Sequence, residues 1–497
     1  MARKKSAKKE LNKIKKSHPG LYIVIVVLLL IVGLGVAYYF ESFDSFLPEN
    51  IKASTVFKKN VNSANPGGNT GGSGTGGSGT GGSGEGQGGT GGSGGSGTGS
   101  HTEEGIVEDV IYPDFQIHFM TLGNADAGDS VYIKAGDTDI LVDAGAVSDS
   151  YTTTSAYVNQ YCKDKKLEYC VATHGDADHI AAFPKYFQNY TIDTVIDFTS
   201  ETYEQFQAFK STGKTARDYF CGTSKTTATY GYYLQARDQY AEHHYTAGDC
   251  FKNLNGAQSV YQLSTNVKMT ILYNKYYFEK GYNGSTAPSG WENNYSVCTL
   301  FTYTKNGKDH NFLLTGDLEL EGEEAMANYY NAAKPETTLP KVDLFKAGHH
   351  GSKTSSNNCL LQKIRPEICV VSCCCGTDEY TGATANQFPT QAFIDRIAPY
   401  TDRVYVTSIF ETYTIKTAEA NSKGKTDKTG VEIGKQYIST SGYKPMNGNV
   451  CVSCNGDAVG LWASNNLIKL KDSEWFKSKV TLDGVEINVR DCPPAWK

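Results

Sequence analysis

The chain has 497 residues and a net charge of −6, and it is too long for one ordinary domain. Residues 1–20 carry eight Lys or Arg and one Glu, so residues 21–497 carry 39 basic and 52 acidic side chains, a balance of −13. This negative net charge argues against a protein that binds long DNA through a uniformly basic surface. It is still compatible with a local basic groove.

Residues 21–40, LYIVIVVLLLIVGLGVAYYF, are uncharged and mostly apolar. A helix of that length is about 30 Å long, which matches the hydrocarbon core of a bilayer. Because the basic residues 1–20 precede it, the positive-inside tendency predicts a cytoplasmic N-terminus and a chain that continues outside the cell. A cleaved signal peptide and a buried core helix are the alternatives. We expect a retained transmembrane anchor in a single-pass membrane protein.

Residues 41–112 form a linker, and most of residues 67–100 is a near-repeat of Gly-Gly-Ser and Gly-Gly-Thr. Such a sequence has no apolar side chains to bury, and glycine makes order entropically costly. We expect a disordered, flexible tether with a reach of about 40 Å. Its predicted role is to hold a folded domain away from the membrane.

Strand patterns that run into loops begin at residue 114. They occur at 114–123, 129–145, 166–180, 342–352 and 366–376, and helical patterns separate several of them, at 151–166 and from 181 onwards. Alternation of strands and helices predicts a layered α/β fold. In such folds the polar residues at the strand ends gather along one edge.

Side chains that can bind metal follow four apolar strands, three of those above and a further one at 312–316. They are Asp143 in ILVDAG, then His174, Asp176, Asp178 and His179 in THGDADHI, then Asp317 in LLTGD, and finally His349 and His350 in KAGHH. The chain has only ten His, and four of them fall in these loops. One polar residue at a strand end is ordinary, but four sets rich in His and Asp predict a metal site.

The motif H-x-D-x-D-H presents alternate side chains in two directions. We expect His174 and Asp176 to face one divalent cation, Asp178 and His179 to face a second, and Asp317 to bridge the two. Two such cations about 3.5–4 Å apart make a metal-bridged hydroxide from water near neutral pH. The alternative, in which the aspartates only cap the following helix, needs one acceptor and not four ligands.

Residues 114–466 resemble a metallo-β-lactamase-fold domain, and more narrowly the metallo-hydrolase domain of ComEC/Rec2-type competence proteins. The resemblance rests on LGNADAGDS (122–130), ILVDAG (140–145), THGDADHIAAF (173–183), NNYSV (293–297), LLTGDLE (313–319), KAGHHGSKTSS (346–356) and a closing hairpin, GNVCVSCNGD (448–457). It implies an αββα sandwich with two divalent metal ions (Zn or Mn) on one edge, and hydrolysis of a phosphodiester. We place the hydrolase domain at 113–466, in a bacterial protein, followed by a C-terminal tail at 467–497.

Three positions depart from the pattern of the wider family. Asp176 replaces a histidine, as in the ComEC-like group, and an added carboxylate shifts preference towards Mn²⁺. Asn293 occupies the region of another histidine, and we expect it and Asp143 to support the site. Phe388 precedes Pro389 where ComEC-like domains usually carry His-Pro. The incomplete ligand set leaves open a catalytically weakened metal-binding or scaffolding module.

The segment HHGSKTSS offers two adjacent histidines that cannot easily face one metal. We choose His349 as the ligand, because it directly follows the glycine that turns the strand, and we expect His350 to orient substrate or protonate the leaving oxygen. Ser352, Lys353 and Thr354 either bind a phosphate oxygen or form a solvated loop. The predicted catalytic residues are Asp178, His350 and Lys353.

The remaining features carry less chemistry. The thirteen cysteines have irregular spacings, so we expect no disulfide framework. Cys451 and Cys454 should lie on opposite faces of one strand, without a mutual bridge. Residues 201–250 and 408–447 look like additions to the domain.

The predicted function is a membrane-anchored, extracellular, metal-dependent phosphodiesterase or nuclease. The alternatives are a hydrolase of cell-wall or lipid phosphodiesters, or the weakened module. The expected partners are a phosphodiester substrate, in nucleic acid or a wall polymer, and the membrane around residues 21–40. The sequence indicates no protein partner.

Overall fold

The computed structural model describes residues 105–212, 227–279, 291–331, 338–421, 424–426, 428 and 430–497. The predicted cytoplasmic tail, the anchor at 21–40 and the linker up to residue 104 lie outside these residues. Within the described part, no helix is both long and apolar enough to cross a membrane.

The first of two large sheets has the strand order β1-β17-β16-β2-β3-β4-β5-β6-β7. Its strands are β1 (Ile106–Glu108), β2 (Phe115–Phe119), β3 (Ser130–Ala135), β4 (Thr138–Ala144), β5 (Lys166–Val171), β6 (Thr191–Asp197), β7 (Ala241–Thr246), β16 (Val450–Cys454) and β17 (Val459–Ala463). The strands from β4 to β7 run parallel. The predicted strands at 114–123 and 129–145 and the closing hairpin are confirmed.

The second sheet has the order β15-β14-β13-β12-β11-β10-β9-β8. Its strands are β8 (Val260–Gln262), β9 (Val267–Ile271), β10 (Thr299–Lys305), β11 (Lys308–Leu314), β12 (Leu344–Lys346), β13 (Ile368–Cys375), β14 (Val404–Thr417) and β15 (Gln436–Pro445). The strands from β11 to β14 run parallel, so their carboxyl ends point to the same edge. A separate hairpin joins β18 (Lys479–Leu482) and β19 (Val485–Asn488).

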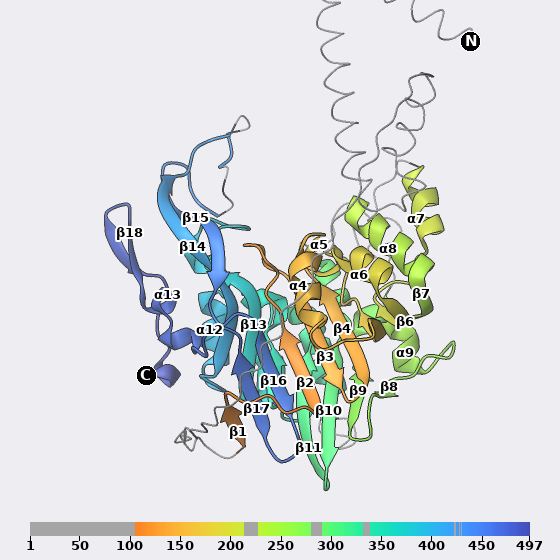
Figure 1. Cartoon of the computed structure of the whole chain (residues 1–497). Helices are drawn as coiled ribbons and strands as arrows, with labels where there is room; N and C mark the ends of the chain where they lie inside the picture. The colour runs from red at the N-terminus through yellow and green to blue at the C-terminus, as the bar shows by residue number, and fades with distance from the viewer. Residues whose placement is uncertain are drawn as a thin grey trace, which may run out of the picture. The chain divides into compact units, whose positions relative to one another are not determined.

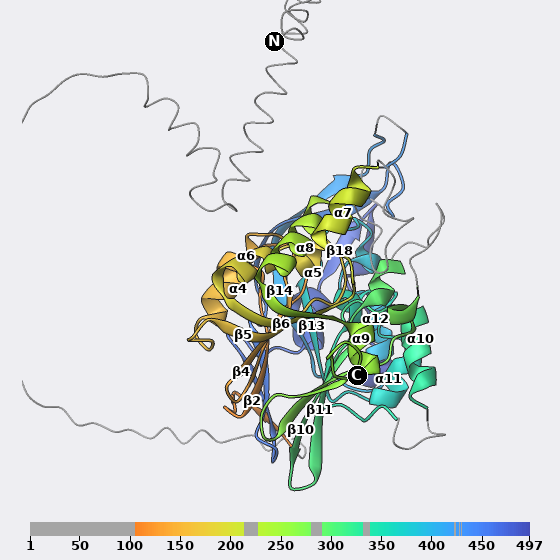
Figure 2. The same ribbon diagram turned by 90° about the vertical axis from the view of Figure 1, so that its right-hand side faces the viewer.

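Helices lie on both outer faces of the paired sheets (Figures 1 and 2). Those nearer the first sheet are α4 (Ser150–Val158), α5 (Ala177–Ile180), α6 (Phe183–Asn189), α7 (Tyr203–Lys210), α8 (Ala228–Tyr240) and α9 (Ala247–Lys252). Those nearer the second are α10 (Leu320–Tyr329), α11 (Asn358–Ile364), α12 (Gln391–Ile397) and α13 (Glu474–Lys477). The 3-10 turns are η2 (Lys275–Phe278), η3 (Trp291–Tyr295), η5 (Gly348–Gly351), η6 (Thr384–Asn386), η7 (Leu470–Asp472) and η8 (Pro494–Trp496). This is the predicted αββα arrangement.

The apolar core between the sheets contains aromatic side chains from both of them. Phe115 of β2 is fully buried, and its ring centroid lies 5.1 Å from that of Phe312 on β11 and 6.2 Å from that of Phe301 on β10. Burying one such side chain contributes about 1.5–3 kcal/mol. The packed sheets form a rigid base for the loops at their carboxyl ends.

The C-terminal residues do not form a separate tail as we had placed them at 467–497. Leu470, Trp475, Phe476 and Trp496 are buried in the same cluster as α11 and α12. The sequence hides this because these apolar residues are spaced too irregularly to show a helix or strand period. At the other end, β1 pairs with β17, so the first sheet begins before residue 113.

The twelve cysteines of the described residues are all free, and Cys221 lies outside these residues. Cys451 and Cys454 share strand β16 without a bridge, as predicted. The two added segments contribute α7, α8 and β7 in one case and the β14–β15 hairpin in the other.

Candidate metal centre

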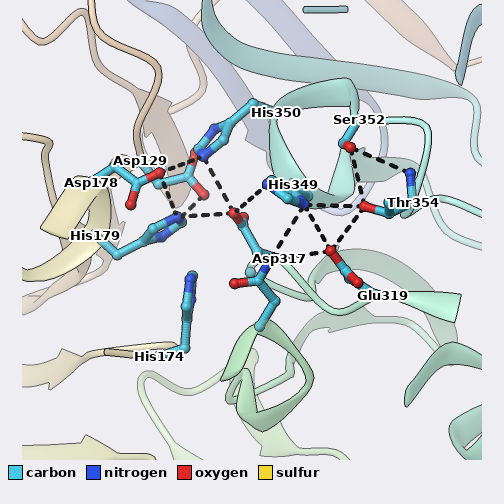
Figure 3. A network of polar contacts seen from close by, with 12 residues as sticks. Asp129, His174, Asp178, His179, Asp317, Glu319, His349, His350, Ser352 and Thr354 are labelled. Carbon is cyan, nitrogen blue, oxygen red and sulfur yellow. Dashed lines mark hydrogen bonds and ion pairs between the residues drawn. The ribbon is translucent and has the colours of Figure 1, made fainter. Parts of the chain in front are cut away.

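The predicted His and Asp side chains meet at the carboxyl ends of strands from both sheets (Figure 3). Asp143 ends β4, His174 and His179 follow β5, Asp317 follows β11 and His350 follows β12. The sandwich brings these five together although 207 positions separate the first from the last. The convergence follows from the parallel strands, whose carboxyl ends share one edge.

Four side chains form a compact group whose ligand atoms all lie within 4.8 Å of one another: Asp178, His179, Asp317 and His350. Asp317 Oδ2 lies 3.2 Å from His179 Nε2 and 3.4 Å from His350 Nε2. Asp178 Oδ2 lies 3.4 Å from His350 Nε2 and 3.9 Å from His179 Nε2. Two imidazoles and two carboxylates therefore point at one common volume.

The orientation of His179 is fixed from behind by Asp143. His179 Nδ1 lies 2.7 Å from Asp143 Oδ2, so Nδ1–H donates to the carboxylate and the lone pair is left on Nε2. Asp143 also accepts from the backbone N–H of Thr173 at 2.8 Å and from its hydroxyl at 2.7 Å. This is the arrangement by which proteins orient metal-binding imidazoles.

His350 and His174 are held in the same way. His350 Nδ1 lies 2.9 Å from the carbonyl oxygen of Ser372 and donates to it. His174 Nδ1 lies 3.1 Å from Thr173 Oγ1, which donates its own proton to Asp143 and so accepts from the ring. In both residues the lone pair is left on Nε2.

Several buried polar atoms have no hydrogen-bond partner among the described residues. Among them are the Nε2 atoms of His174, His179 and His350, together with Asp317 Oδ1 and Asn293 Oδ1. A buried acceptor without a hydrogen-bond partner costs free energy. A cluster of such acceptors therefore implies that another species binds between them. Imidazole nitrogen with carboxylate oxygen is the donor set of a transition-metal cation such as Zn²⁺ or Mn²⁺. The residues present therefore fit a divalent cation.

The charges around this volume also favour cations. Burial alone would lower the pKa of His350, but the carboxylates of Asp317 and Asp129 overcome it and raise the pKa to about 10. Burial also opposes protonation of His179, yet Asp317 and Asp143 raise its pKa well above the usual value. Without a metal the imidazoles would hold protons, so a cation that binds here displaces protons.

Residues for a second cation lie beside the first group but are less tightly gathered. His349 Nε2 is 3.8 Å from Asp317 Oδ2, and its side chain is 23% exposed. Asn293, on η3, directs its amide nitrogen to Glu319 Oε1 at 3.2 Å. Asp176 flanks the start of α5 and is not in the compact group. Binding of a second cation with Asp317 as the bridge stays a prediction.

The geometry reverses the roles predicted for the two adjacent histidines. His350 is fully buried and belongs to the compact group, whereas His349 turns towards Glu319 and Thr354, with Nδ1 at 3.3 Å and 3.2 Å. Both residues have left-handed backbone angles, φ 54° for His350 and φ 47° for His349. Two such residues in a row are strained and aim their rings in different directions.

The residues after the histidines hold the loop together instead of lining a phosphate site. Thr354 Oγ1 donates to Glu319 Oε1 at 2.9 Å and lies 3.1 Å from Ser352 Oγ. The exposed Lys353 directs its ammonium to Asn386 Oδ1 at 3.1 Å. Asn386 does not belong to the compact group, so the predicted catalytic role of Lys353 has no support in this geometry.

Sequence reasoning missed a buried ion pair beside the group. Lys346 Nζ lies 2.5 Å from Asp129 Oδ2 and 3.8 Å from Asp317 Oδ1. Burial would lower the pKa of Lys346, but Asp129 and Asp317 raise it, so the ammonium stays charged. The only signal was the position of both residues within the motifs at 122–130 and 346–356. Lys346 offsets part of the negative charge that Asp129, Asp143, Asp178 and Asp317 gather here.

His243 and His244 lie on the edge strand β7 and do not belong to this centre. His244 Nε2 lies 2.9 Å from Asp197 Oδ1, and the exposed His243 lies near Asp193 and Glu242. Exposed acidic groups of this kind are common without a metal.

Comparison with known proteins agrees with this geometry. The family model of the metallo-beta-lactamase superfamily matches residues 123–197, the stretch that supplies Asp143, His174, Asp178 and His179. Recombination protein 2 of Haemophilus influenzae is 28% identical over 159 residues, covering 28% of this chain and 18% of that protein. ComE operon protein 3 of Bacillus subtilis is 38% identical over 61 residues, covering 12% and 7%. The chain thus spans less than a fifth of the length of these relatives.

Solved structures of metallo-β-lactamases are also similar at low identity. MEM-A1, a subclass B3 enzyme from a soil metagenome library, is 14% identical with a TM-score of 0.26, covering 44% of this chain and 64% of that chain. SMB-1 is 12% identical with a TM-score of 0.24, covering 44% and 65%.

The αββα sandwich, the metal-ligand cluster and the family match over residues 123–197 together make the described domain similar to those of the metallo-β-lactamase class. Within that class, the chain resembles the metallo-hydrolase domains of competence proteins of the ComEC/Rec2 type. The resemblance inferred from the motifs is confirmed.

Proposed function

We propose that this protein is a membrane-anchored, extracellular phosphodiesterase that depends on divalent metal ions. The observation that carries the proposal is a set of buried imidazole Nε2 atoms without hydrogen-bond partners among the described residues. Those of His179 and His350 face Asp317, and the ring of His174 lies beside that of His179. A fold alone does not define a substrate, so the proposal rests on this site.

Divalent cations held here would supply Lewis acidity, lowering the pKa of water and neutralising the oxygens of a phosphodiester. The chain contributes the rest. Hydrogen bonds from Nδ1 of His179 to Asp143 and from Nδ1 of His350 to the Ser372 carbonyl leave the Nε2 atom of each ring free to bind a cation. Thr173 holds the Asp143 carboxylate in place. His349 keeps a partly exposed ring beside the group, so it is placed to orient substrate or to protonate the leaving oxygen.

The location is part of the proposal. Residues 21–40 would anchor the chain, and the basic residues 1–20 would keep the N-terminus in the cytoplasm. The glycine-rich linker would then carry the catalytic domain outside the cell.

The test is hydrolysis of bis-p-nitrophenyl phosphate by the full chain in detergent, first stripped of metal and then loaded with Mn²⁺ or Zn²⁺. We expect turnover only in the loaded protein, and its loss in Asp317→Asn. A matched control is Asp137→Asn, in the exposed turn between β3 and β4, which should keep turnover. Metal-loaded protein without turnover would contradict a phosphodiesterase and would support the weakened metal-binding module.

A cell-wall or lipid phosphodiester is the second candidate substrate. The predicted anchor and linker favour it, because they would hold the catalytic domain at the cell envelope, where such phosphodiesters lie. Hydrolysis of single-stranded DNA against glycerol phosphate polymer separates the two. Faster cleavage of the polymer would favour the second candidate.

A further inference from the structure

Tyr380 lies beside the metal centre although no sequence motif marks it. Its hydroxyl donates to Asp178 Oδ2 at 3.3 Å, and Asp178 belongs to the compact group. Tyr380 is 49% exposed, so the ring is not needed to fill the core. Single exposed aromatic residues are ordinary on a protein surface. This one stands a single hydrogen bond away from Asp178, a side chain of the compact group, so its ring lies next to the candidate centre.

Phe388 continues the aromatic surface from Tyr380 to the imidazoles. The ring centroids of Tyr380 and Phe388 are 5.6 Å apart, and that of Phe388 lies 5.8 Å from His349 and 6.0 Å from His350. We call Tyr380 and Phe388 the aromatic wall. It leads from solvent to the metal-ligand cluster along one side.

The loop that carries the aromatic wall is fixed at several points. Glu379 Oε2 accepts from the backbone N–H of Ala127 at 2.7 Å, next to Tyr380. The carbonyl of Phe388 accepts from the N–H of Gly376 at 2.7 Å. Arg490, fully buried, donates to the carbonyls of Gln387 and Pro389 on either side of Phe388. A surface held in place before binding loses little entropy when a ligand packs on it.

We propose that the aromatic wall binds a planar aromatic group on the alcohol next to the scissile phosphate, as in a nucleotide. The site would therefore prefer phosphodiesters of the nucleic-acid type over those of polyols such as glycerol. This inference rests on the proposed phosphodiesterase function. Stacking of one base on an aromatic side chain is sequence-tolerant, and its loss weakens binding about tenfold.

The experiment compares two small ligands on the full chain loaded with Mn²⁺. Isothermal titration gives the Kd for thymidine 5′-monophosphate and for glycerol 1-phosphate, which share the phosphate and differ in the base. Tyr380→Leu removes the ring, Tyr380→Phe keeps the ring and removes the hydroxyl, and Tyr413→Leu is a control. Tyr413 is also 49% exposed but lies on the projecting part of β14.

We expect thymidine monophosphate to bind the unchanged protein at least about tenfold more tightly than glycerol phosphate. Tyr380→Leu should remove most of that preference at unchanged manganese content, whereas Tyr380→Phe and Tyr413→Leu should keep it. Equal binding of the two ligands, or a preference that survives Tyr380→Leu, would overturn the inference. A preference lost equally in Tyr380→Phe would overturn it too, because the hydroxyl and not the ring would then be responsible.

The same preparations report on the proposed function independently. If the ring-dependent preference is present but bis-p-nitrophenyl phosphate is not hydrolysed, the aromatic wall stands and the phosphodiesterase proposal fails. If hydrolysis is present without the preference, the phosphodiesterase proposal stands and the aromatic wall fails.

Discussion

The carboxylate of Asp143 and the imidazole of His179 meet at 2.7 Å, although they come from different segments of the chain. Asp143 takes a left-handed backbone conformation, φ 55°, at the end of β4. It also accepts two hydrogen bonds from Thr173. One carboxylate thereby joins β4 to the metal-binding loop after β5 and decides which nitrogen of His179 is free.

We predict that Asp143→Asn weakens metal binding about 10- to 100-fold, as is typical when a partner of a metal-binding imidazole is changed. The amide has one acceptor oxygen where three donors meet, so His179 loses its fixed orientation. Competition with a chelator measures the affinity for Zn²⁺. Asp137→Asn, in an exposed turn, is the matched control. An affinity equal to that of the unchanged protein would show that Asp143 does not orient the ligand.

The two adjacent histidines should differ in their effect on metal content. His350→Ala removes a buried nitrogen from the compact group, so affinity for the tighter cation should fall by more than about 100-fold. His349→Ala removes a partly exposed ring and should leave most of that affinity, while lowering turnover. Metal per chain after dialysis and kcat separate the two variants. The opposite pattern would restore His349 as the ligand.

Stability should fall in acid through His118, which is not part of the metal-ligand group. Burial lowers the pKa of His118 to about 3, and the neutral ring contacts Tyr157 and Gln116 at 3.0 Å each. The folded pKa lies below the unfolded value of 6.5, so the stabilisation is present above pH 6.5 and is lost as pH falls towards 3. The free energy of unfolding should drop by about 1.4 kcal/mol per pH unit from this group.

Urea unfolding at pH 7 and pH 5, with chelator present, measures this dependence. His118→Gln cannot titrate in this range, so its stability should change less between the two pH values. The same pH dependence in both proteins would assign the acid sensitivity to other groups.

Arg490 should stabilise the fold from the C-terminal segment. Its guanidinium donates to the carbonyls of Thr384, Gln387 and Pro389, and it packs 4.7 Å from the ring of Trp475. Arg490→Met leaves buried carbonyls unpaired and should lower the free energy of unfolding by about 1–3 kcal/mol. Lys at this position should not restore it, because one ammonium cannot reproduce the planar set of donors.

Chemical denaturation measures the change, with Lys479→Met as control. The side chain of Lys479 is 57% exposed and pairs with Glu486 at 2.8 Å, and such a surface pair contributes little to stability. Equal stability of Arg490→Met and the unchanged protein would mean that the loop around Phe388 does not depend on the C-terminal segment.

The sequence predicted the layered fold and most of the metal-binding residues for a local reason. His174 and Asp317 each come three residues after an apolar strand, and Asp178 and His179 lie in the short helix that follows the same loop as His174. Strand ends are visible in the sequence as a change from apolar to polar residues. Their convergence then follows from parallel pairing, which a single sequence only implies.

The errors and omissions concern features that no local pattern contains. The choice between His349 and His350 depends on two left-handed residues in a row, and the sequence at that point does not distinguish them. The pairing of Lys346 with Asp129 and the contact of Tyr380 with Asp178 join residues about 200 positions apart. The apolar residues near Arg490 in the sequence show no helix or strand period. We therefore predicted residues 467–497 to be a tail, although Arg490 is buried in the fold.

Anomalous X-ray scattering from crystals of residues 105–497 grown with Mn²⁺ or Zn²⁺ is the most direct test of the metal centre. We predict a peak about 2.0–2.2 Å from Nε2 of His179 and His350, with carboxylate oxygens of Asp178 and Asp317 at similar distances. Crystals that contain the metal elsewhere, or bind none while these side chains keep their positions, would contradict the centre.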